Sequence, residues 1–271
     1  STLIPCELSE QTSRALTQLA QSLGVQEKSV WCSAYLALLS LLSGSDQVVG
    51  TSISQSRPEI PGGDKMIGVF LNALPISMGL FGKRWMDLIT ATDRELREQH
   101  AYRQYPLAEI QGLTGLDLSA TTFHYSNWHV YYEGVDGEAT REEWVPNKVG
   151  GWQETNYLLT VYVHKDDKSK RSYVSVGADT EVFDAQCRER IGGYLTRIVA
   201  AMVADATAVI EKTSLLSEEE RHRQVIEWNA TAHAYPHDKC MHELFEAQVK
   251  ARATQIAVTD GDRSLTYEEL D

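Results

Sequence analysis

The sequence predicts an α+β fold in which helices cover one face of a mixed β-sheet. Segments with helical spacing and segments rich in β-branched residues follow one another without the strict alternation of a parallel α/β protein. The connections are long, as the polar stretch over 134–155 indicates. Apolar residues make up 42% of the 271 residues and charged residues 23%, which is usual for a globular protein.

Two helices and a strand are expected in the N-terminal part. The first helix begins at a capping sequence over 9–12, carries leucines three or four residues apart and ends at Gly24. The second, over 27–42, is apolar on a wide face, which is typical of a buried helix. The β-branched residues of 47–54 then predict a strand.

The central part alternates strands with one helix. Residues 67–78 are mostly apolar and predict a buried strand, in which Pro75 indicates an edge, a bulge or an early end. Residues 84–100 have helical spacing. Residues 120–132 alternate and are rich in aromatics, so we expect the even-numbered side chains of this strand to share one face.

The C-terminal part of this unit reads as a hairpin and a closing helix. Two strands, over 157–164 and 172–179, flank a charged loop. A helix over 184–204 follows, with apolar residues three or four apart. The charged residues of 218–224 then predict a linker helix.

The composition excludes several kinds of partner. The formal net charge of −13 argues against nucleic acid, because phosphate recognition needs a basic surface. No uncharged apolar run is long enough to span a bilayer, and the first residues do not resemble a signal peptide. The cysteines lie far apart without a CxxC motif, so we expect free thiols and a cytoplasmic protein; they are Cys6, Cys32, Cys187 and Cys240.

One group of potential metal ligands is present near the C-terminal end. It consists of His233, His237, Cys240 and His242. Their spacing fits no standard zinc finger, and Pro236 interrupts it. We therefore expect no metal site and no cofactor bound by this chain.

One run carries a specific family resemblance. Residues 66–75 read MIGVFLNALP and are similar to the IGxFVNTxxxR core motif of the condensation domains of nonribosomal peptide synthetases. Gly68 permits close backbone approach, and Asn72 is a polar residue within an apolar run. Ser77 stands where the family has its arginine. Periodicity alone would read this run as a strand with one hydrogen-bonded asparagine.

Weaker resemblances lie further along the chain. The runs over 102–108 and 116–123 match two other condensation-domain motifs in part. Residues 123–130 read FHYSNWHV and resemble an FNYxHFHV strand of the family, with His124 in the place of the asparagine. In the family this strand lines the channel between two lobes, whereas an aromatic strand taken alone usually packs in a core.

The C-terminal runs MHELFE and SLTYEEL resemble the opening of an adenylation domain. No two histidines are adjacent, so the chain has no HHxxxDG motif, which the family places in its N-terminal lobe together with the catalytic histidine. The resemblance therefore implies the C-terminal lobe of a condensation domain over 1–216, a linker over 217–239 and a truncated adenylation start over 240–271.

The family fold has two lobes, each an αβ sandwich like chloramphenicol acetyltransferase. The resemblance implies amide formation between an acyl or peptidyl donor and an aminoacyl acceptor, both carried on phosphopantetheine arms of carrier domains. It also implies that the N-terminal lobe, the donor and acceptor carrier proteins and the downstream adenylation domain are partners. We expect none of the residues present to act as the general base, and we expect the chain alone to be inactive.

The residues expected to line the substrate tunnel are His124, Ser126, Trp128, Asn72 and Arg57. The alternative for His124 is a histidine that is merely hydrogen-bonded within the sheet. Three other functions stay open: a heterocyclisation relative with DxxxxD in the other lobe, an epimerisation relative, and a non-catalytic platform that docks carriers.

Overall fold

The computed structural model describes residues 2–127, 155–166 and 171–271. The chain divides into two compact units, Ser1–Leu216 and Ser217–Asp271. Within the described part of the first unit, six strands form one sheet in the order β1-β6-β5-β4-β2-β3. The strands are β1 (Thr2–Cys6), β2 (Gln47–Gln55), β3 (Leu71–Gly79), β4 (Thr121–Asn127), β5 (Leu159–Lys165) and β6 (Ser172–Ala178).

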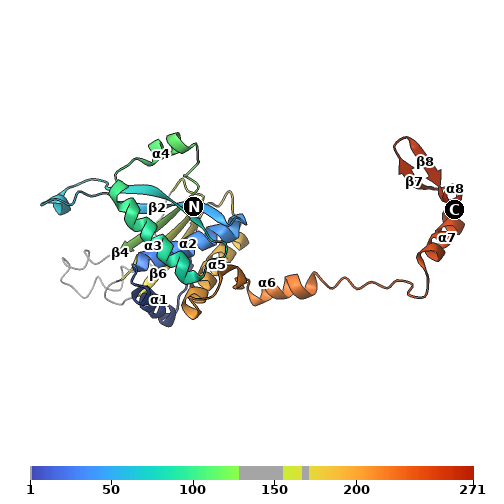
Figure 1. The fold of residues 1–271 in the computed structure, drawn as a ribbon, viewed down its shortest axis with the longest axis horizontal. Helices are drawn as coiled ribbons and strands as arrows, with labels where there is room; N and C mark the ends of the chain where they lie inside the picture. The colour runs from blue at the N-terminus through green and yellow to red at the C-terminus, as the bar shows by residue number, and fades with distance from the viewer. Residues whose placement is uncertain (1, 128–154, 167–170) are drawn as a thin grey trace. The chain divides into compact units, whose positions relative to one another are not determined.

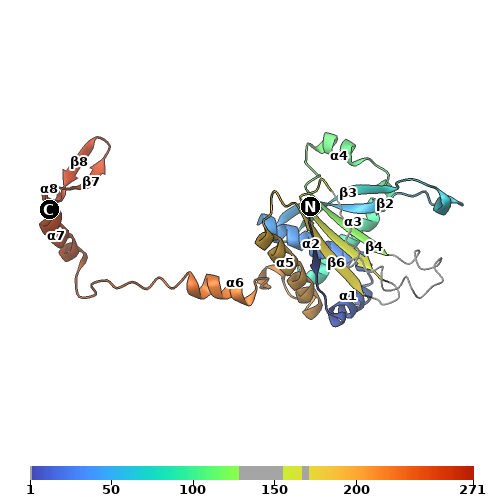
Figure 2. The same cartoon turned by 180° about the vertical axis from the view of Figure 1, so that it is seen from behind.

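Helices cover one face of this sheet (Figure 1) and leave its strands in front when the unit is seen from behind (Figure 2). The covering helices are α1 (Glu10–Leu23), α2 (Glu27–Ser43), α3 (Trp85–Gln99) and α5 (Ala185–Ala204). Strand β4 runs parallel to both of its neighbours, β2 and β5, while the other neighbouring strands are antiparallel. The predicted arrangement, helices on one face of a mixed sheet, is confirmed.

The predicted N-terminal helices form because their ends carry the expected signals. The Ser9 hydroxyl accepts a hydrogen bond from the backbone N–H of Thr12, and Gly24 ends α1 with a φ of 66°. Helix α2 is the centre of the core, since Trp31 and Tyr35 have no exposed surface. Burying both rings contributes several kcal/mol in total, at roughly 1.5–3 kcal/mol for a large side chain.

The predicted strand over 67–78 is correct only in its second part. Strand β3 begins at Leu71, and the residues Ile67 and Val69 before it are 102% and 90% exposed. The backbone N–H and the hydroxyl of Ser56 both bond to the carbonyl of Phe70, so the apolar run before β3 belongs to the β2–β3 connection. Pro75 is tolerated because β3 lies at the edge of the sheet, one of the positions predicted.

Strand β1 and helix α4 of the first unit were not predicted. Strand β1 pairs with β6, with Ile4 opposite Val176. Helix α4 (Leu107–Thr114) follows Pro106. Both are short, and their sequences have little periodicity to reveal them. The predicted hairpin is confirmed as the antiparallel pair β5–β6, whereas the excursion expected over 134–155 lies almost entirely outside the described residues.

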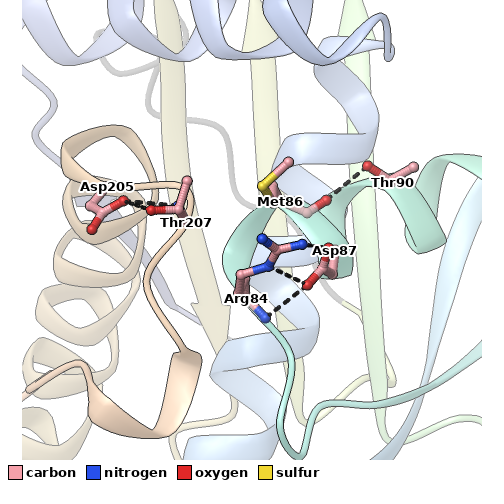
Figure 3. A network of polar contacts seen from close by, with 6 residues as sticks. All are labelled: Arg84, Met86, Asp87, Thr90, Asp205 and Thr207. Atoms are coloured by element: carbon pink, nitrogen blue, oxygen red, sulfur yellow. Dashed lines mark hydrogen bonds and ion pairs between the residues drawn. The ribbon is translucent and has the colours of Figure 1, made fainter.

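The segment after α5 completes the start of α3 (Figure 3). The N–H of Met86 donates to the carbonyl of Ala206 over 2.8 Å, and Asp205 binds the Thr207 hydroxyl within the same turn. At the helix start, Arg84 and Asp87 form a two-point ion pair. The bond from Met86 satisfies one of the backbone N–H groups that a helix N-terminus otherwise leaves unpaired.

The second unit is described throughout, and none of its residues is buried. It contains α6 (Glu218–His222), α7 (Met241–Arg252), the hairpin strands β7 (Ile256–Asp260) and β8 (Arg263–Thr266), and α8 (Tyr267–Leu270). The Phe245 and Tyr267 rings lie 5.9 Å apart. The predicted linker helix is present as α6, which Ser217 caps.

Candidate functional site

The two faces of strand β4 differ in chemistry. The Phe123 ring stacks on Tyr35 of α2 at 5.8 Å, and the Thr121 hydroxyl lies 2.8 Å from the Tyr35 hydroxyl. These odd-numbered side chains therefore point toward the helices. Because successive side chains alternate along a strand, His124 and Ser126 share one face, as predicted, and this face is the one without helices.

Strand β5 adds two polar side chains to this face. His124 is opposite Tyr162, and Ser126 is opposite His164. The Ser126 Oγ lies 2.5 Å from His164 Nδ1. The His124 ring centroid is 5.9 Å from that of Tyr162 and 6.2 Å from that of His164. We call these four residues the β4–β5 cluster.

The sequence prediction missed Tyr162 and His164. They are far from His124 along the chain, and only the parallel pairing of β4 with β5 brings them together. The signal that could have found them is the alternation of 157–164, in which both fall on even positions.

The histidines of the cluster are held in their neutral form. Burial lowers the pKa of His124, and the nearby positive charge of Lys28 lowers it further. Burial, followed by the neighbouring His124, lowers the pKa of His164 to about 4. At neutral pH the cluster therefore presents uncharged imidazoles, which can donate or accept hydrogen bonds but carry no charge to repel a cation.

The Lys28 side chain lies near His124, just beyond the end of the pairing between β2 and β4. The ladder between β2 and β4 is formed by Thr51 with Thr122 and Ser52 with Phe123. Beyond it, the Lys28 ammonium donates to the carbonyl of Ile53 over 3.2 Å. Burial lowers the pKa of Lys28. This ammonium is the positive charge that acts on His124.

Asn72, a predicted tunnel residue, has a different environment. It shares a strand face with Leu74 and Ile76, which are buried, Ile76 in the core beneath the helices. Its side-chain amide donates to the carbonyls of Arg103 and Tyr105 over 3.1 and 2.7 Å. The structure therefore does not bring Asn72 to the β4–β5 cluster. Its amide instead forms hydrogen bonds between the edge strand β3 and the segment that follows α3.

The remaining two predicted tunnel residues are also not in the cluster. Arg57 donates to the carbonyls of Gly63 and Met66, and its guanidinium lies 4.3 Å from the centre of the Phe70 ring. All of these contacts lie within the β2–β3 connection, which Arg57 therefore stabilises. Trp128 lies outside the described residues.

The potential ligands near the C-terminal end form no metal centre. Across 2–127, 155–166 and 171–271, no three His, Cys, Asp or Glu side chains are placed to hold one ion. The His237 ring instead packs at 4.0 Å against Tyr235. Over the same ranges, no helix has the length and apolar character needed to cross a bilayer.

The comparison with protein families decides how this architecture is classified. The model of the condensation domain family matches residues 3–225. This chain belongs to the condensation domain family. Among curated proteins, it is 30% identical both to bacitracin synthase 3 of Bacillus licheniformis and to malpibaldin synthetase of Mortierella alpina. The matches cover 97% and 98% of this chain but only 4% and 5% of the two relatives.

Solved structures agree on the fold of this condensation domain chain. A four-domain nonribosomal peptide synthetase bound to AMP and glycine aligns with 99% of the chain at a TM-score of 0.72 and 17% identity, using 21% of its own length. The first condensation domain of the CDA synthetase aligns with 80% at 0.63 and 17% identity, using 48% of its length. The X-domain in its complex with OxyB from teicoplanin biosynthesis aligns with 80% at 0.65 and 15% identity, using 48% of that chain. The expected chloramphenicol-acetyltransferase-like sandwich is confirmed.

Proposed function

We propose that this chain contributes the C-terminal lobe of a condensation domain that forms amide bonds in nonribosomal peptide synthesis. The observation that carries the proposal is the family match over 3–225, joined to the coverage of the solved domains. The chain aligns through 80% of its length with 48% of a complete condensation domain, which is what one lobe of two would give. The absence of an HHxxxDG motif supports the same assignment.

The second unit is proposed to link this lobe to an adenylation domain. Residues 217–239 would be the linker, and 240–271 the start of that domain. Two observations support the division. The boundary between the two compact units in the sequence falls between Leu216 and Ser217, and 99% of the chain aligns with a four-domain synthetase bound to AMP and glycine. The MHELFE and SLTYEEL runs are further support.

In the proposed reaction the acceptor amine attacks the thioester carbon of the donor. The C–N bond forms as the C–S bond breaks, and the released thiol takes up the proton that the amine loses. Both substrates would arrive on phosphopantetheine arms of carrier domains. Holding the two reactants close together in the reactive orientation accounts for much of the rate acceleration of such a step.

The proposed contribution of this chain is a polar wall for the tunnel between the lobes. His124 and Ser126 point to the helix-free face of the sheet. The neutral imidazoles of the β4–β5 cluster can form hydrogen bonds there, and, unlike imidazolium ions, they do not protonate the attacking amine. The general base would be supplied by the other lobe. The N-terminal lobe, both carriers and the downstream adenylation domain are the proposed partners. A cytoplasmic location fits the free cysteines.

A second candidate is a docking platform without amide-forming activity. The alignment with an X-domain that was solved in complex with another protein favours it, because that structure shares the fold at a TM-score of 0.65. On this reading, the helix-free face and the second unit would bind proteins, and the β4–β5 cluster would be structural.

Amide synthesis by the chain and its upstream lobe separates these candidates. The purified chain is incubated with donor- and acceptor-loaded carriers, alone and after addition of the preceding lobe of the same synthetase. We expect product only in the second case, and none when the catalytic histidine of an HHxxxDG motif in that lobe is replaced by alanine. Turnover by the chain alone would contradict the proposal. Carrier binding without product in the reassembled protein would establish the platform.

A further inference from the structure

The Lys28 ammonium lies on the side of strand β2 that faces β4. It donates to the carbonyl of Ile53 over 3.2 Å. On the edge strand, the carbonyl of Pro75 accepts from the side chain of Gln99, so the backbone of Pro75 points away from β2. Thr51 is paired with Pro75, and the two residues of such an antiparallel pair turn their backbone groups in opposite directions. Thr51 and, two residues later, Ile53 therefore direct their carbonyls toward β4.

His124 is the residue of β4 at this point. The ladder between the parallel strands β2 and β4 ends with Ser52 opposite Phe123, and the next residues along the two strands are Ile53 and His124. Both strands continue beyond this pair. Lys28 therefore binds the Ile53 carbonyl where a further ladder bond would form, beside His124. The same proximity explains why, after burial, the Lys28 charge is the second cause that lowers the pKa of His124.

The Lys28 cation has no counter-charge among the described residues. Over 2–127, 155–166 and 171–271 it forms no ion pair, and the carboxylate of the adjacent Glu27 is bound by Lys165 instead. Lys28 is half-buried, and charges in such places are usually paired. An ammonium has three N–H donors, of which Ile53 takes one. The remaining donors are available to a group from outside the chain.

The His124 imidazole adds a neutral donor next to this cation. Its ring contacts are with Tyr162 and His164, at 5.9 and 6.2 Å between centroids. Within the part of the chain that the structure describes, its nitrogens form no hydrogen bond, and the residue is half-buried. A neutral imidazole has one N–H to donate. A cation with unused donors beside a neutral N–H is suited to bind an anionic oxygen.

We propose that Lys28 and His124 together form a binding point for a negatively charged oxygen of the tethered substrate. This inference rests on the proposed function, since the oxygen would belong to a substrate held in the tunnel. Two parts of such a substrate can carry it: the phosphate of the phosphopantetheine arm and a carboxylate in the acyl group. Both would pair with the ammonium and accept from the imidazole N–H.

Anion binding can be measured without catalysis. Nitrogen-15 NMR of the full 271-residue chain follows the His124 ring while inorganic phosphate or acetate replaces chloride at constant ionic strength. We expect a saturable shift with at least one of the two anions, its loss in Lys28→Met and its retention in Lys28→Arg, which keeps the charge. No saturable shift with either anion, or the same shift in Lys28→Met, would overturn the proposal.

The kinetic arm uses the synthetase that contains both lobes. Four substrates are offered as donor and as acceptor: aspartyl and asparaginyl thioesters, each of phosphopantetheine and of pantetheine. We expect Lys28→Met to raise the KM about 10-fold only for those with the bound anion, on the order of one lost charged hydrogen bond. A loss confined to the phosphopantetheine pair identifies the phosphate, and a loss confined to the aspartyl pair identifies the carboxylate. An equal loss with all four, or none with any, would contradict the proposal.

Two controls separate binding from packing. Lys212→Met removes an exposed lysine and should leave the KM unchanged for all four substrates. Lys28→Met should not lower the thermal stability, because it replaces a half-buried unpaired cation by an apolar side chain of similar length. If the synthetase makes no amide, the proposed function fails, while the anion titration of the chain still decides whether Lys28 and His124 bind a negatively charged oxygen.

Discussion

The Lys165 ammonium lies 3.0 Å from each carboxylate oxygen of Glu27, and it joins the end of β5 to the start of α2. Only 6% of the lysine side chain and 13% of the glutamate side chain are exposed. Thr17 and Ser172 donate to the same carboxylate over 2.9 and 3.1 Å. One buried pair therefore connects four elements: α1, α2, β5 and β6.

Breaking this pair on one side should strongly destabilise the first unit. We expect Lys165→Met to lower the free energy of unfolding by about 3–5 kcal/mol, because it leaves the Glu27 carboxylate buried without its cation. The double variant Lys165→Met with Glu27→Leu should lose less than Lys165→Met alone. Urea unfolding measures both. Arg14→Ala, which removes an exposed pair with Glu10, is the control and should change stability by under about 0.5 kcal/mol.

Two glycines should respond to alanine in opposite directions. A Cβ on Gly50 would lie 2.3 Å from the Tyr35 hydroxyl oxygen and 2.9 Å from a methyl carbon of Leu39, so Gly50→Ala should cost about 1–3 kcal/mol. Gly112 lies within α4 with no atom within 4 Å of an added Cβ, so Gly112→Ala should stabilise by up to about 1 kcal/mol. Thermal unfolding compares them; equal shifts would show that the close approach of α2 to β2 is not tight.

The half-buried His164 predicts acid sensitivity. The pKa of His164 falls from 6.5 to about 4 on folding, so between these values the unfolded chain binds more protons. Stability is therefore complete above pH 6.5 and decreases as the pH falls toward 4, with a slope of at most about 1.4 kcal/mol per pH unit from this group. His164→Asn should reduce the slope measured by urea unfolding across this range. An unchanged slope would mean that His164 titrates normally.

Protease cleavage should begin in the second unit. Every residue from 221 to 240 is exposed, and 230–236 has no regular secondary structure. We expect trypsin to cut first at Arg221, Arg223 or Lys239 and to release a resistant product that ends near Leu216. Mass spectrometry of a short digest identifies the sites. Early cutting within α2 or α5 would contradict the boundary between the units.

His124 should affect condensation more than a residue on the other face of β4. In the complete synthetase we expect His124→Ala to lower kcat for amide formation about 10-fold, on the order of one hydrogen bond lost in the transition state. Tyr125→Phe is the matched control, since Tyr125 packs against the core. Adenylation should stay unchanged in both. A folded His124→Ala protein with full activity would reduce His124 to a residue of the sheet.

The structure brings together only some of the predicted tunnel residues, for a physical reason. Alternation along β4 is local, so the shared direction of His124 and Ser126 could be read from the sequence. The positions of Asn72 and Arg57 could not, because a motif match does not say whether a side chain faces a channel or bonds to nearby carbonyls. Both donate to the backbone of their own unit.

The sequence by itself determined the local structure: the capped helices α1 and α2, the hairpin β5–β6 and the helix-then-strand order that makes one face of the sheet apolar. These follow from periodicity, capping and β-branched content, which act over a few residues. Only the tertiary structure decided that β4 lies between β2 and β5. That choice depends on long-range packing, and it alone places His164 against Ser126 across 38 residues of chain.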